Sequence, residues 1–293
     1  MATSTTPDLT TRTLDVPGAV LTYDVRRNAT TDEPPLFLIG SPRGASGFAQ
    51  LAERFPDRMI VTYDPRGVER SRKTDGTIEV TREQHAADVH AVIEAVGGGP
   101  VDLFASSGGA VNALALVARY PGDVRTLVAH EPPAATVLPD REAVLAAVRD
   151  LGEMYQRSGF GAGMAKFIAF TSHKGPIPAD FASRPAPDPA MFGMPTADDG
   201  RRDDPLLAQN LQTTVTYEPD FDALKAAPTR IVVAAGAASE GQFEYRGAFG
   251  VAERLGTKPV IFPGGHTGFN KSERDPSGDP DAFAAKLREV LNR

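Results

Sequence analysis

The fold of this 293-residue chain is decided by one stretch, VDLFASSGGAVNAL, which spans residues 101–114. It has the pattern of a buried strand, a small-x-Ser-x-Gly turn and a helix. A serine hydroxyl is a poor nucleophile unless a base takes its proton and its oxygen projects free of neighbours. A tight strand-to-helix turn projects the oxygen, but it strains the serine backbone and needs small residues two positions before and after. Ala105 and Gly109 meet this need around Ser107, whereas Ser106 would put Phe104 there, so we predict Ser107 as the nucleophile.

Strand and helix patterns alternate on both sides of this stretch. Two alternating runs, Arg12–Val16 and Val20–Arg26, are separated by Pro17-Gly18 and predict an antiparallel hairpin. Short apolar runs typical of strands buried on both faces, with helical patterns between them, imply a mostly parallel sheet with right-handed crossovers. The strand runs are Leu36–Ile39, Met59–Tyr63, Val101–Ala105, Thr126–His130, Arg230–Ala235 and Pro259–Phe262, and the helical patterns are Gln84–Val96, Gly108–Tyr120, Gly241–Leu255 and Asp281–Leu291.

The alternation is interrupted once, between Pro132 and Pro228. This segment opens with a helical pattern, Arg141–Arg157, and later holds seven prolines between Pro176 and Pro205. An insertion of this length between two sheet strands indicates a lid. We therefore predict an α/β core at residues 12–131 and 229–293, a mainly helical cap at 132–228 and a disordered tail at 1–11.

With these motifs in place, the chain resembles the α/β-hydrolase superfamily over nearly all of its length after Thr11. The resemblance implies an eight-stranded, mostly parallel sheet flanked by helices. Gly40-Ser41-Pro42 resembles the oxyanion turn of that superfamily, with Ile39 in place of its usual His. The resemblance implies that the backbone N–H groups of Ser41 and Gly108 form the oxyanion hole. Asp64–Ser71 resembles the superfamily's Asp-x-Arg-Gly-x-Gly-x-Ser loop, with Glu69 at the second Gly, and we interpret that loop as structural.

The candidate base is His266. It lies in Pro263-Gly264-Gly265-His266-Thr267-Gly268, directly after the last predicted strand. A short loop there can bring an imidazole over the carboxyl edge of the sheet, where the serine turn also lies. The order of serine first and histidine last is also that of the superfamily.

The remaining four histidines have other interpretations. His85 and His90 are five residues apart on one helical pattern and so do not share a helix face, which argues against a metal pair. His173 lies in the lid and is expected to be solvated. His130 ends a strand and is either a core histidine or a wall of the pocket.

Two glutamates compete for the role of the acid that orients His266. The superfamily usually has an Asp in the turn after the next-to-last strand, but here that turn has Ser239 at the expected position, with Glu240 one residue later. Glu131 directly follows the strand beside the serine strand. Tyr120–Arg125 and His130-Glu131-Pro132-Pro133 locally resemble the fungal lactonases that open the zearalenone macrocycle, and this resemblance implies a catalytic glutamate at Glu131. We favour Glu131 and keep Glu240 as the alternative.

The favoured function is hydrolysis of an apolar carboxylic ester or lactone through an acyl-enzyme on Ser107, with no cofactor or metal. The same triad also suits carbon–carbon bond hydrolases and perhydrolases, and a ligand-binding homologue without turnover is the alternative from another class. The candidate pocket residues are His130 and the lid's Met154, Phe160, Met164, Phe167 and Phe170.

Composition limits the partners. The formal net charge is −7, from 38 acidic and 31 basic residues, which argues against nucleic acid and an anionic membrane surface as partners. Cysteine is absent, which excludes disulfides, thiolate catalysis and cysteine metal sites. No stretch resembles a signal peptide or a membrane span, so a cytoplasmic location is expected. The oligomeric state stays open, a homodimer included.

Overall fold

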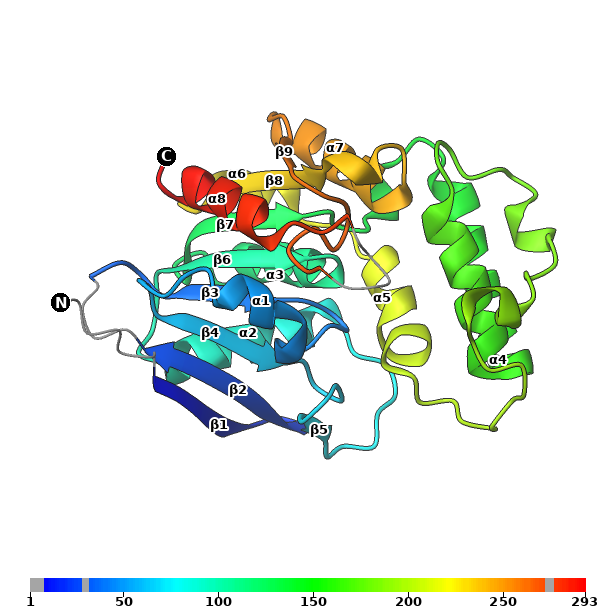
Figure 1. The fold of residues 1–293 in the computed structure, drawn as a ribbon, viewed down its shortest axis with the longest axis horizontal. Helices are drawn as coiled ribbons and strands as arrows, with labels where there is room; N and C mark the ends of the chain where they lie inside the picture. Colours follow the sequence, from blue (N-terminus) through cyan, green and yellow to red (C-terminus); the bar gives the residue numbers. More distant parts are fainter. Residues whose placement is uncertain (1–7, 28–31, 272–276) are drawn as a thin grey trace.

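The computed structural model describes residues 8–27, 32–271 and 277–293. A mostly parallel sheet runs through the centre (Figure 1), and its main path has the strand order β1-β2-β4-β3-β6-β7-β8-β9. Strand β2 pairs antiparallel with β1, β4 and the short β5, whereas all pairings from β4 to β9 are parallel. The predicted sheet of eight strands is thus confirmed along the main path, with β5 as an addition. The strands are β1 Asp8–Val16, β2 Ala19–Arg27, β3 Leu36–Ile39, β4 Ile60–Asp64, β5 Arg72–Lys73, β6 Val101–Ser106, β7 Val124–His130, β8 Arg230–Gly236 and β9 Val260–Phe262.

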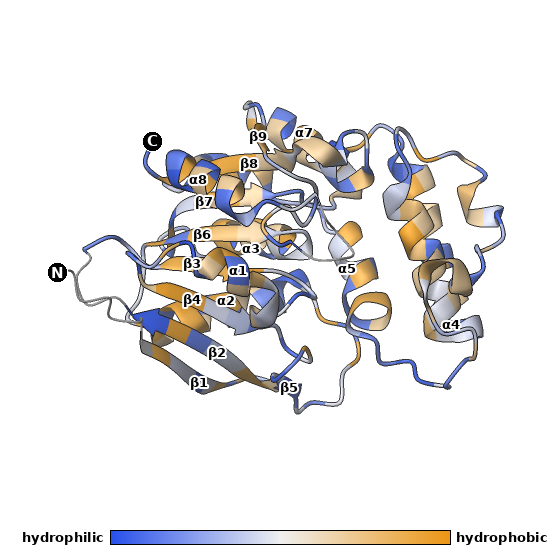
Figure 2. Cartoon of the chain, viewed as in Figure 1, coloured by the Kyte–Doolittle hydropathy of each residue, from blue (hydrophilic) through white to orange (hydrophobic). Residues whose placement is uncertain are grey.

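Helices cover both faces of the sheet. They are α1 Ala49–Ala52, α2 Arg82–Ala95, α3 Gly108–Arg119, α4 Arg141–Ser172, α5 Leu211–Val215, α6 Phe221–Ala226, α7 Phe243–Leu255 and α8 Pro280–Leu291. The cluster that includes residues of α2, α3, α6 and α7 also takes in Leu103 and Ala105 of β6. Phe104 of the same strand belongs to the opposite cluster, with α1 and α8. Successive strand side chains point to opposite faces, so a strand buried on both faces is mainly apolar, as Figure 2 shows for β3 and β6.

The segment between β7 and β8 forms a separate layer, set beside the sheet in Figure 1. It has its own apolar cluster, built from α4, α5 and the turns between them. Helix α4 continues well past the predicted end at Arg157, and it is broken at Gly159, whose φ of 79° and ψ of −171° suit only glycine. The proline-rich stretch contains two short 3-10 turns, at Phe181–Ser183 and Pro189–Phe192. We call residues 132–220 the lid.

Two expected boundaries differ from the structure. Helix α6 lies within the predicted cap at 132–228, yet its Phe221 and Leu224 belong to the core cluster on the sheet. Strand β1 begins at Asp8, because its pairing with β2 extends to Arg27, so the expected tail at 1–11 is wrong from Asp8 onward. Residues 1–7 lie outside the described part of the chain.

No helix in the described ranges combines the length and the apolar character needed to cross a bilayer.

Candidate active site

Ser107 lies in the turn between β6 and α3 with φ 58° and ψ −131°. Its N–H donates a hydrogen bond to the carbonyl oxygen of His130, at 2.9 Å, which ties the turn to the end of β7. A Cβ on Gly109 would lie 2.7 Å from the Cα of Gly40, so only glycine fits two residues after the serine. Among the described non-glycine residues, φ is positive at Glu69, Ser107 and Glu131. Strained backbone of this kind gathers at functional sites, and Ser107 and Glu131 are two of the candidate residues.

The structure brings His266 and Glu131 together. The Nδ1 atom of His266 lies 2.6 Å from Oε2 of Glu131. The other carboxylate oxygen, Oε1, accepts a hydrogen bond from the N–H of Gly236 at 2.8 Å, and the Glu131 side chain is fully buried. Because Nδ1 is engaged by the carboxylate, Nε2 is the ring nitrogen left for a serine hydroxyl. This is the arrangement that orients a general base.

Charge stabilises the pair. Burial on its own raises the pKa of Glu131, but the hydrogen bond with His266 and the positive charge of the ring outweigh it and lower the pKa to about 2. Burial has the opposite effect on the base and lowers the pKa of His266. The hydrogen bond and the charge of Glu131 outweigh burial, so the net shift of the His266 pKa is upward. Glu131 is therefore ionised at neutral pH, and its charge favours the protonated form of the His266 ring.

The alternative acid does not contact the imidazole. Glu240 follows the 3-10 turn Ala237–Ser239 and is exposed. That turn touches the histidine loop through its backbone, since the N–H of Ala238 donates to the carbonyl oxygen of Gly264 at 2.8 Å. Of the two candidate acids, the structure places only Glu131 against His266.

The two predicted oxyanion residues pack directly on one another. A Cβ on Gly108 would lie 2.6 Å from the carbonyl oxygen of Ser41, and both residues line the same cavity as Ser107. In that position, the N–H at the start of α3 and the N–H of Ser41 suit a developing negative charge.

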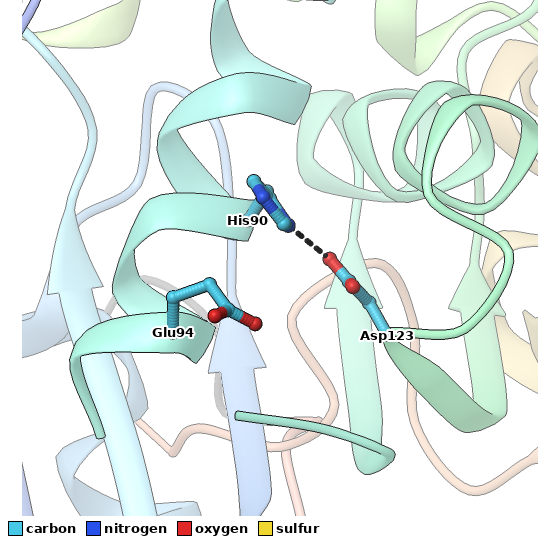
Figure 3. A group of neighbouring side chains, drawn as sticks. All are labelled: His90, Glu94 and Asp123. Atoms are coloured by element: carbon cyan, nitrogen blue, oxygen red, sulfur yellow. Dashed lines mark hydrogen bonds and ion pairs between the residues drawn. The ribbon is translucent and has the colours of Figure 1, made fainter. Parts of the chain in front are cut away.

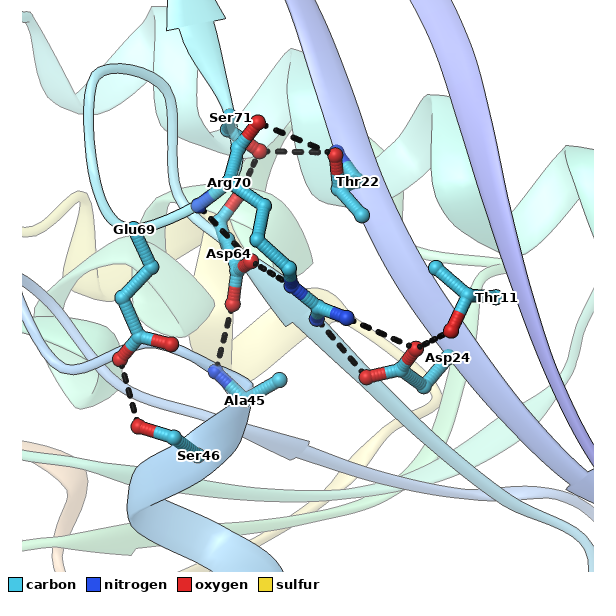
Figure 4. A network of polar contacts seen from close by, with 9 residues as sticks. All are labelled: Thr11, Thr22, Asp24, Ala45, Ser46, Asp64, Glu69, Arg70 and Ser71. Atoms are coloured by element: carbon cyan, nitrogen blue, oxygen red, sulfur yellow. Dashed lines mark hydrogen bonds and ion pairs between the residues drawn. The ribbon is translucent and has the colours of Figure 1, made fainter.

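The Asp64–Ser71 loop supports the turn that carries Ser41 (Figure 4). Asp64 accepts hydrogen bonds from the N–H of Ala45, at 2.8 Å, and from Nε of Arg70, at 2.6 Å. Ser71 closes the loop by donating to the carbonyl oxygen of Asp64 at 2.6 Å. The bonds with Ala45 and with the carbonyl oxygen of Asp64 fix backbone, which agrees with a structural function for the loop.

A small cavity of about 40 Å³ lies between Ser107 and the lid. Of the predicted pocket residues, Phe167 and Phe170 line it. Phe160 and Met164 pack into the lid's own cluster instead, and Met154, half-buried on α4, is not among the lining residues. The break at Gly159 separates Met154 from the other four, because the residues beyond it no longer follow the helical phase of Arg141–Arg157. The cavity is lined by Ser41, Ser107, Gly108, Pro133, Phe167, Phe170, Leu206, Asn210, Leu211, Thr214, Val215, Phe243 and Glu244.

His130 is a core residue, so its assignment to the pocket is wrong. The side chain is fully buried, and its ring packs against those of Phe104, Phe262 and Phe283. Strand alternation sends it to the face covered by α8, away from the cavity. Burial lowers the pKa of His130 to about 4, so the ring is neutral at physiological pH.

The sequence interpretation missed the second half of the lid and the start of α7. Leu211 and Val215 lie four residues apart on α5 and thus share the face that lines the cavity. This spacing of four residues could have indicated a helix face toward the cavity, but a helix of five residues is too short to be recognised by its period. Phe243 and Glu244 come from the first turn of α7.

A second group of polar side chains lies away from Ser107 (Figure 3). His90, Glu94 and Asp123 each offer one atom within 4.8 Å of the others, which is the reach of a metal ion. The group also has a structural explanation. Nδ1 of His90 lies 2.8 Å from a carboxylate oxygen of Asp123, and the His90 ring stacks on Tyr120 at 4.0 Å. These contacts join α2 to the turn after α3.

Known proteins share this architecture. The α/β hydrolase fold family matches residues 27–224. An uncharacterised hydrolase of Bacillus subtilis strain 168, YraK, is 29% identical over 289 residues, which is 96% of each chain.

Solved structures agree at the level of the fold. Naproxen esterase (carboxylesterase NP) from Bacillus subtilis has a TM-score of 0.62 at 13% identity, covering 98% of this chain and 92% of that one. The enol-lactonase from Burkholderia xenovorans LB400 has a TM-score of 0.63 at 18% identity, covering 96% of this chain and all of the other. The matched family range takes in well over half of the chain, including Ser107 and Glu131, and the protein therefore belongs to the α/β hydrolase fold family.

Proposed function

We propose that this protein hydrolyses carboxylic esters or lactones, with Ser107 as nucleophile, His266 as general base and Glu131 as the acid that orients it. The observation that carries the proposal is the contact of 2.6 Å between Glu131 and Nδ1 of His266, beside a serine held at positive φ. A surface histidine has no need of a fully buried carboxylate, and a plain turn has no need of a strained serine.

The reaction follows from the positions of these groups. Nε2 of His266 takes the proton of Ser107 as its oxygen attacks the substrate carbonyl, and Glu131 stabilises the imidazolium. The N–H groups of Gly108 and Ser41 bind the tetrahedral oxyanion. His266 then gives the proton to the leaving alcohol, which in a lactone stays attached to the acyl group. Water, activated by the same imidazole, releases the acid from Ser107.

The cavity supports an apolar substrate, because most of its lining comes from aromatic and aliphatic side chains. The local resemblance to lactonases of the zearalenone type adds macrolactones to the substrates to be tested. A volume of about 40 Å³ holds only a fragment of such a ring, so a macrolactone requires the lid to move.

The test uses a fluorophosphonate probe and p-nitrophenyl esters of rising chain length, alongside aromatic macrolactones. We expect the probe to label the wild-type protein and Ser106→Ala but not Ser107→Ala. Ser107→Ala should lower ester turnover by roughly 10⁴-fold or more with the fold intact by circular dichroism. Labelling without turnover of any ester or lactone would contradict the proposed function. Loss of labelling in Ser106→Ala but not in Ser107→Ala would identify Ser106 as the nucleophile instead.

A further inference from the structure

Glu244 is a buried carboxyl in the wall of the cavity that contains Ser107. It is the second residue of α7, and only 8% of it is exposed. No lysine, arginine or histidine of the described chain pairs with it, and the only hydrogen bond of its carboxyl is with its own backbone N–H. A buried carboxyl whose one hydrogen-bond partner among the described residues is its own backbone is incompletely bonded, which costs stability, so its presence in a cavity calls for an explanation.

The helix dipole alone does not explain this position. A carboxylate in the first turn of a helix is favoured by the dipole wherever it points, including toward water. Here the packing of α7 turns the side chain inward. A Cβ on Gly247 would overlap the carbonyl oxygen of Pro132, so the first turns of α7 lie against the segment that follows Glu131.

The surroundings favour the protonated form of Glu244 more than water does. Burial raises the pKa of this carboxyl, and the nearby charge of Glu131 raises it further, while His266 acts in the opposite direction and is outweighed. A protonated carboxyl group donates and accepts hydrogen bonds, whereas an ionised one only accepts them. A hydroxyl group of a bound molecule can donate and accept, so it fits the carboxyl group in either form.

The position of the cavity indicates which part of the substrate it receives. Its wall includes Ser41 and Gly108, whose N–H groups bind the carbonyl oxygen of the scissile bond in the proposed reaction. His266, which must protonate the leaving group, is not among the described lining residues, so the cavity takes the acyl part. The side chain of Asn210 already has hydrogen-bond partners within the protein. Its amide oxygen lies 2.8 Å from Nε2 of His85, and its amide nitrogen donates to the carbonyl oxygen of Pro205. Glu244 is thus the one titratable side chain in the wall.

We propose that Glu244 determines substrate specificity through a hydrogen bond between its carboxyl group and a hydroxyl substituent on the acyl chain. The inference rests on the proposed ester or lactone hydrolysis. A site built to hydrogen-bond such a hydroxyl rejects the analogue that lacks it, because the buried carboxyl is then left without this partner.

The test compares p-nitrophenyl butyrate with its 2- and 3-hydroxy derivatives as substrates. The measured quantity is the ratio of kcat/KM for a hydroxylated ester to that for the plain ester. We expect the better hydroxylated ester to have a ratio above one in the wild type, and Glu244→Leu to lower that ratio by roughly 10- to 100-fold. Glu244→Gln should keep most of the preference, because an amide N–H still donates. Glu240→Leu is the matched control, since it removes an exposed carboxyl just before the same helix and should leave the ratio as in the wild type.

Each outcome has a clear meaning. A ratio in Glu244→Leu within about twofold of the wild type overturns the inference, as does an equal loss in Glu240→Leu. Circular dichroism melting checks that Glu244→Leu folds, and Glu244→Met replaces it under the same criteria if it does not. If the wild type cleaves none of these esters or the lactones, the proposed function fails. If it cleaves them with an unchanged ratio in the variants, only the assignment of Glu244 fails.

Discussion

Glu131 combines a strained backbone with a fully satisfied carboxylate. Its φ is 50°, its N–H donates to the carbonyl oxygen of Ala234 at 2.9 Å, and its two side-chain oxygens contact Gly236 and His266. The hydrogen bonding between β7 and β8 continues through Glu131 and holds its backbone in this strained conformation. The carboxylate therefore meets the imidazole from a rigid position.

This rigidity leads to a prediction for Glu131→Gln. We expect kcat to fall by a factor on the order of 10²–10⁴, because the amide neither fixes the working tautomer nor stabilises the imidazolium. Steady-state kinetics on a p-nitrophenyl ester measures the loss. Glu240→Gln is the control and should change kcat by less than about threefold, since Glu240 is exposed. A larger loss in Glu240→Gln than in Glu131→Gln would exchange the two assignments.

The pKa of His266 predicts the pH dependence. A general base acts in its neutral form, so kcat/KM falls as the pH drops below the pKa of the imidazole. The pair with Glu131 raises that pKa, which places the acid limb of the profile above the ordinary value of 6.5. In Glu131→Gln the hydrogen bond to an ionised group is lost, so the limb of the residual activity should move to lower pH. A limb that moves upward, or stays in place, would show that Glu131 does not set the charge of His266.

At the scale of elements, the buried strands were predictable because each is a short and mainly apolar run. The run ending at Ala105 is one residue shorter than β6, and the run Met59–Tyr63 is shifted by one residue from β4. The short elements α1, α5 and α6 were not predicted, since four to six residues are too few to show a helical period. Helix α4 is longer than predicted because three glycines, at 159, 161 and 163, are typical of the end of a helix.

The site residues also differ in how far the local sequence predicts them. The serine turn and the histidine loop carry local signals, small residues around Ser107 and glycines around His266. The contact between Glu131 and His266 joins residues 135 positions apart, so it depends on the strand order β6-β7-β8 rather than on any local pattern. Glu244 was missed for a related reason: a glutamate in the first turn of a helix ordinarily faces water, and only the packing of α7 turns it inward.

The proline-rich part of the lid is held by few backbone hydrogen bonds. Between its 3-10 turn at Pro189–Phe192 and Asp204, the N–H groups of Gly200 and Arg201 bond to nearby Asp side chains rather than to regular structure. Such segments open at low free-energy cost. We expect trypsin to cut first after Arg201, since Arg184 precedes a proline and resists it. Mass spectrometry of early fragments locates the cut.

The same digestion tests whether this segment closes over the site. Modification of Ser107 by a fluorophosphonate should slow the cut after Arg201, and Ser107→Ala treated with the same reagent should be cut at the untreated rate. Cleavage that starts elsewhere in the chain, or an equal rate with and without the probe in the wild type, would contradict the assignment of this segment as a lid.

At the scale of the molecule, the lid is fixed to the core at two places. Just before α4, Asp140 pairs with Arg246 of α7, and a second set of bonds lies just before α5. Gln209 donates to the carbonyl oxygen of Arg66 at 2.7 Å, and the amide oxygen of Asn210 accepts from Arg82 at 3.1 Å. These bonds hold the stretch before α5 on the core, next to α2. Helix α4 packs within the lid cluster and also on the core, where the ring of its Phe170 lies 5.1 Å from that of Phe243 in α7. Gln212 of α5 in turn donates to the carbonyl oxygen of Val148 in α4 at 2.6 Å, so a larger cavity requires these contacts to shift or a smaller side chain in the wall.

The contacts that hold the lid matter because the cavity is small. Pockets for small molecules usually measure about 300–1,000 Å³, whereas this one holds about 40 Å³ between Ser107 and Phe167. The wild type should therefore prefer short acyl chains unless α4 moves. Phe167→Ala removes a ring from the α4 side of the cavity, and each further methylene buried there contributes about 0.8 kcal/mol. Room for two or three methylenes corresponds to a rise on the order of 10- to 100-fold in kcat/KM for p-nitrophenyl octanoate relative to the acetate. Met164→Ala, from the same helix but packed inside the lid cluster, is the matched control and should change stability without shifting the chain-length optimum. If both variants leave the optimum where the wild type has it, the acyl chain does not occupy this cavity, and the substrate reaches Ser107 from another side.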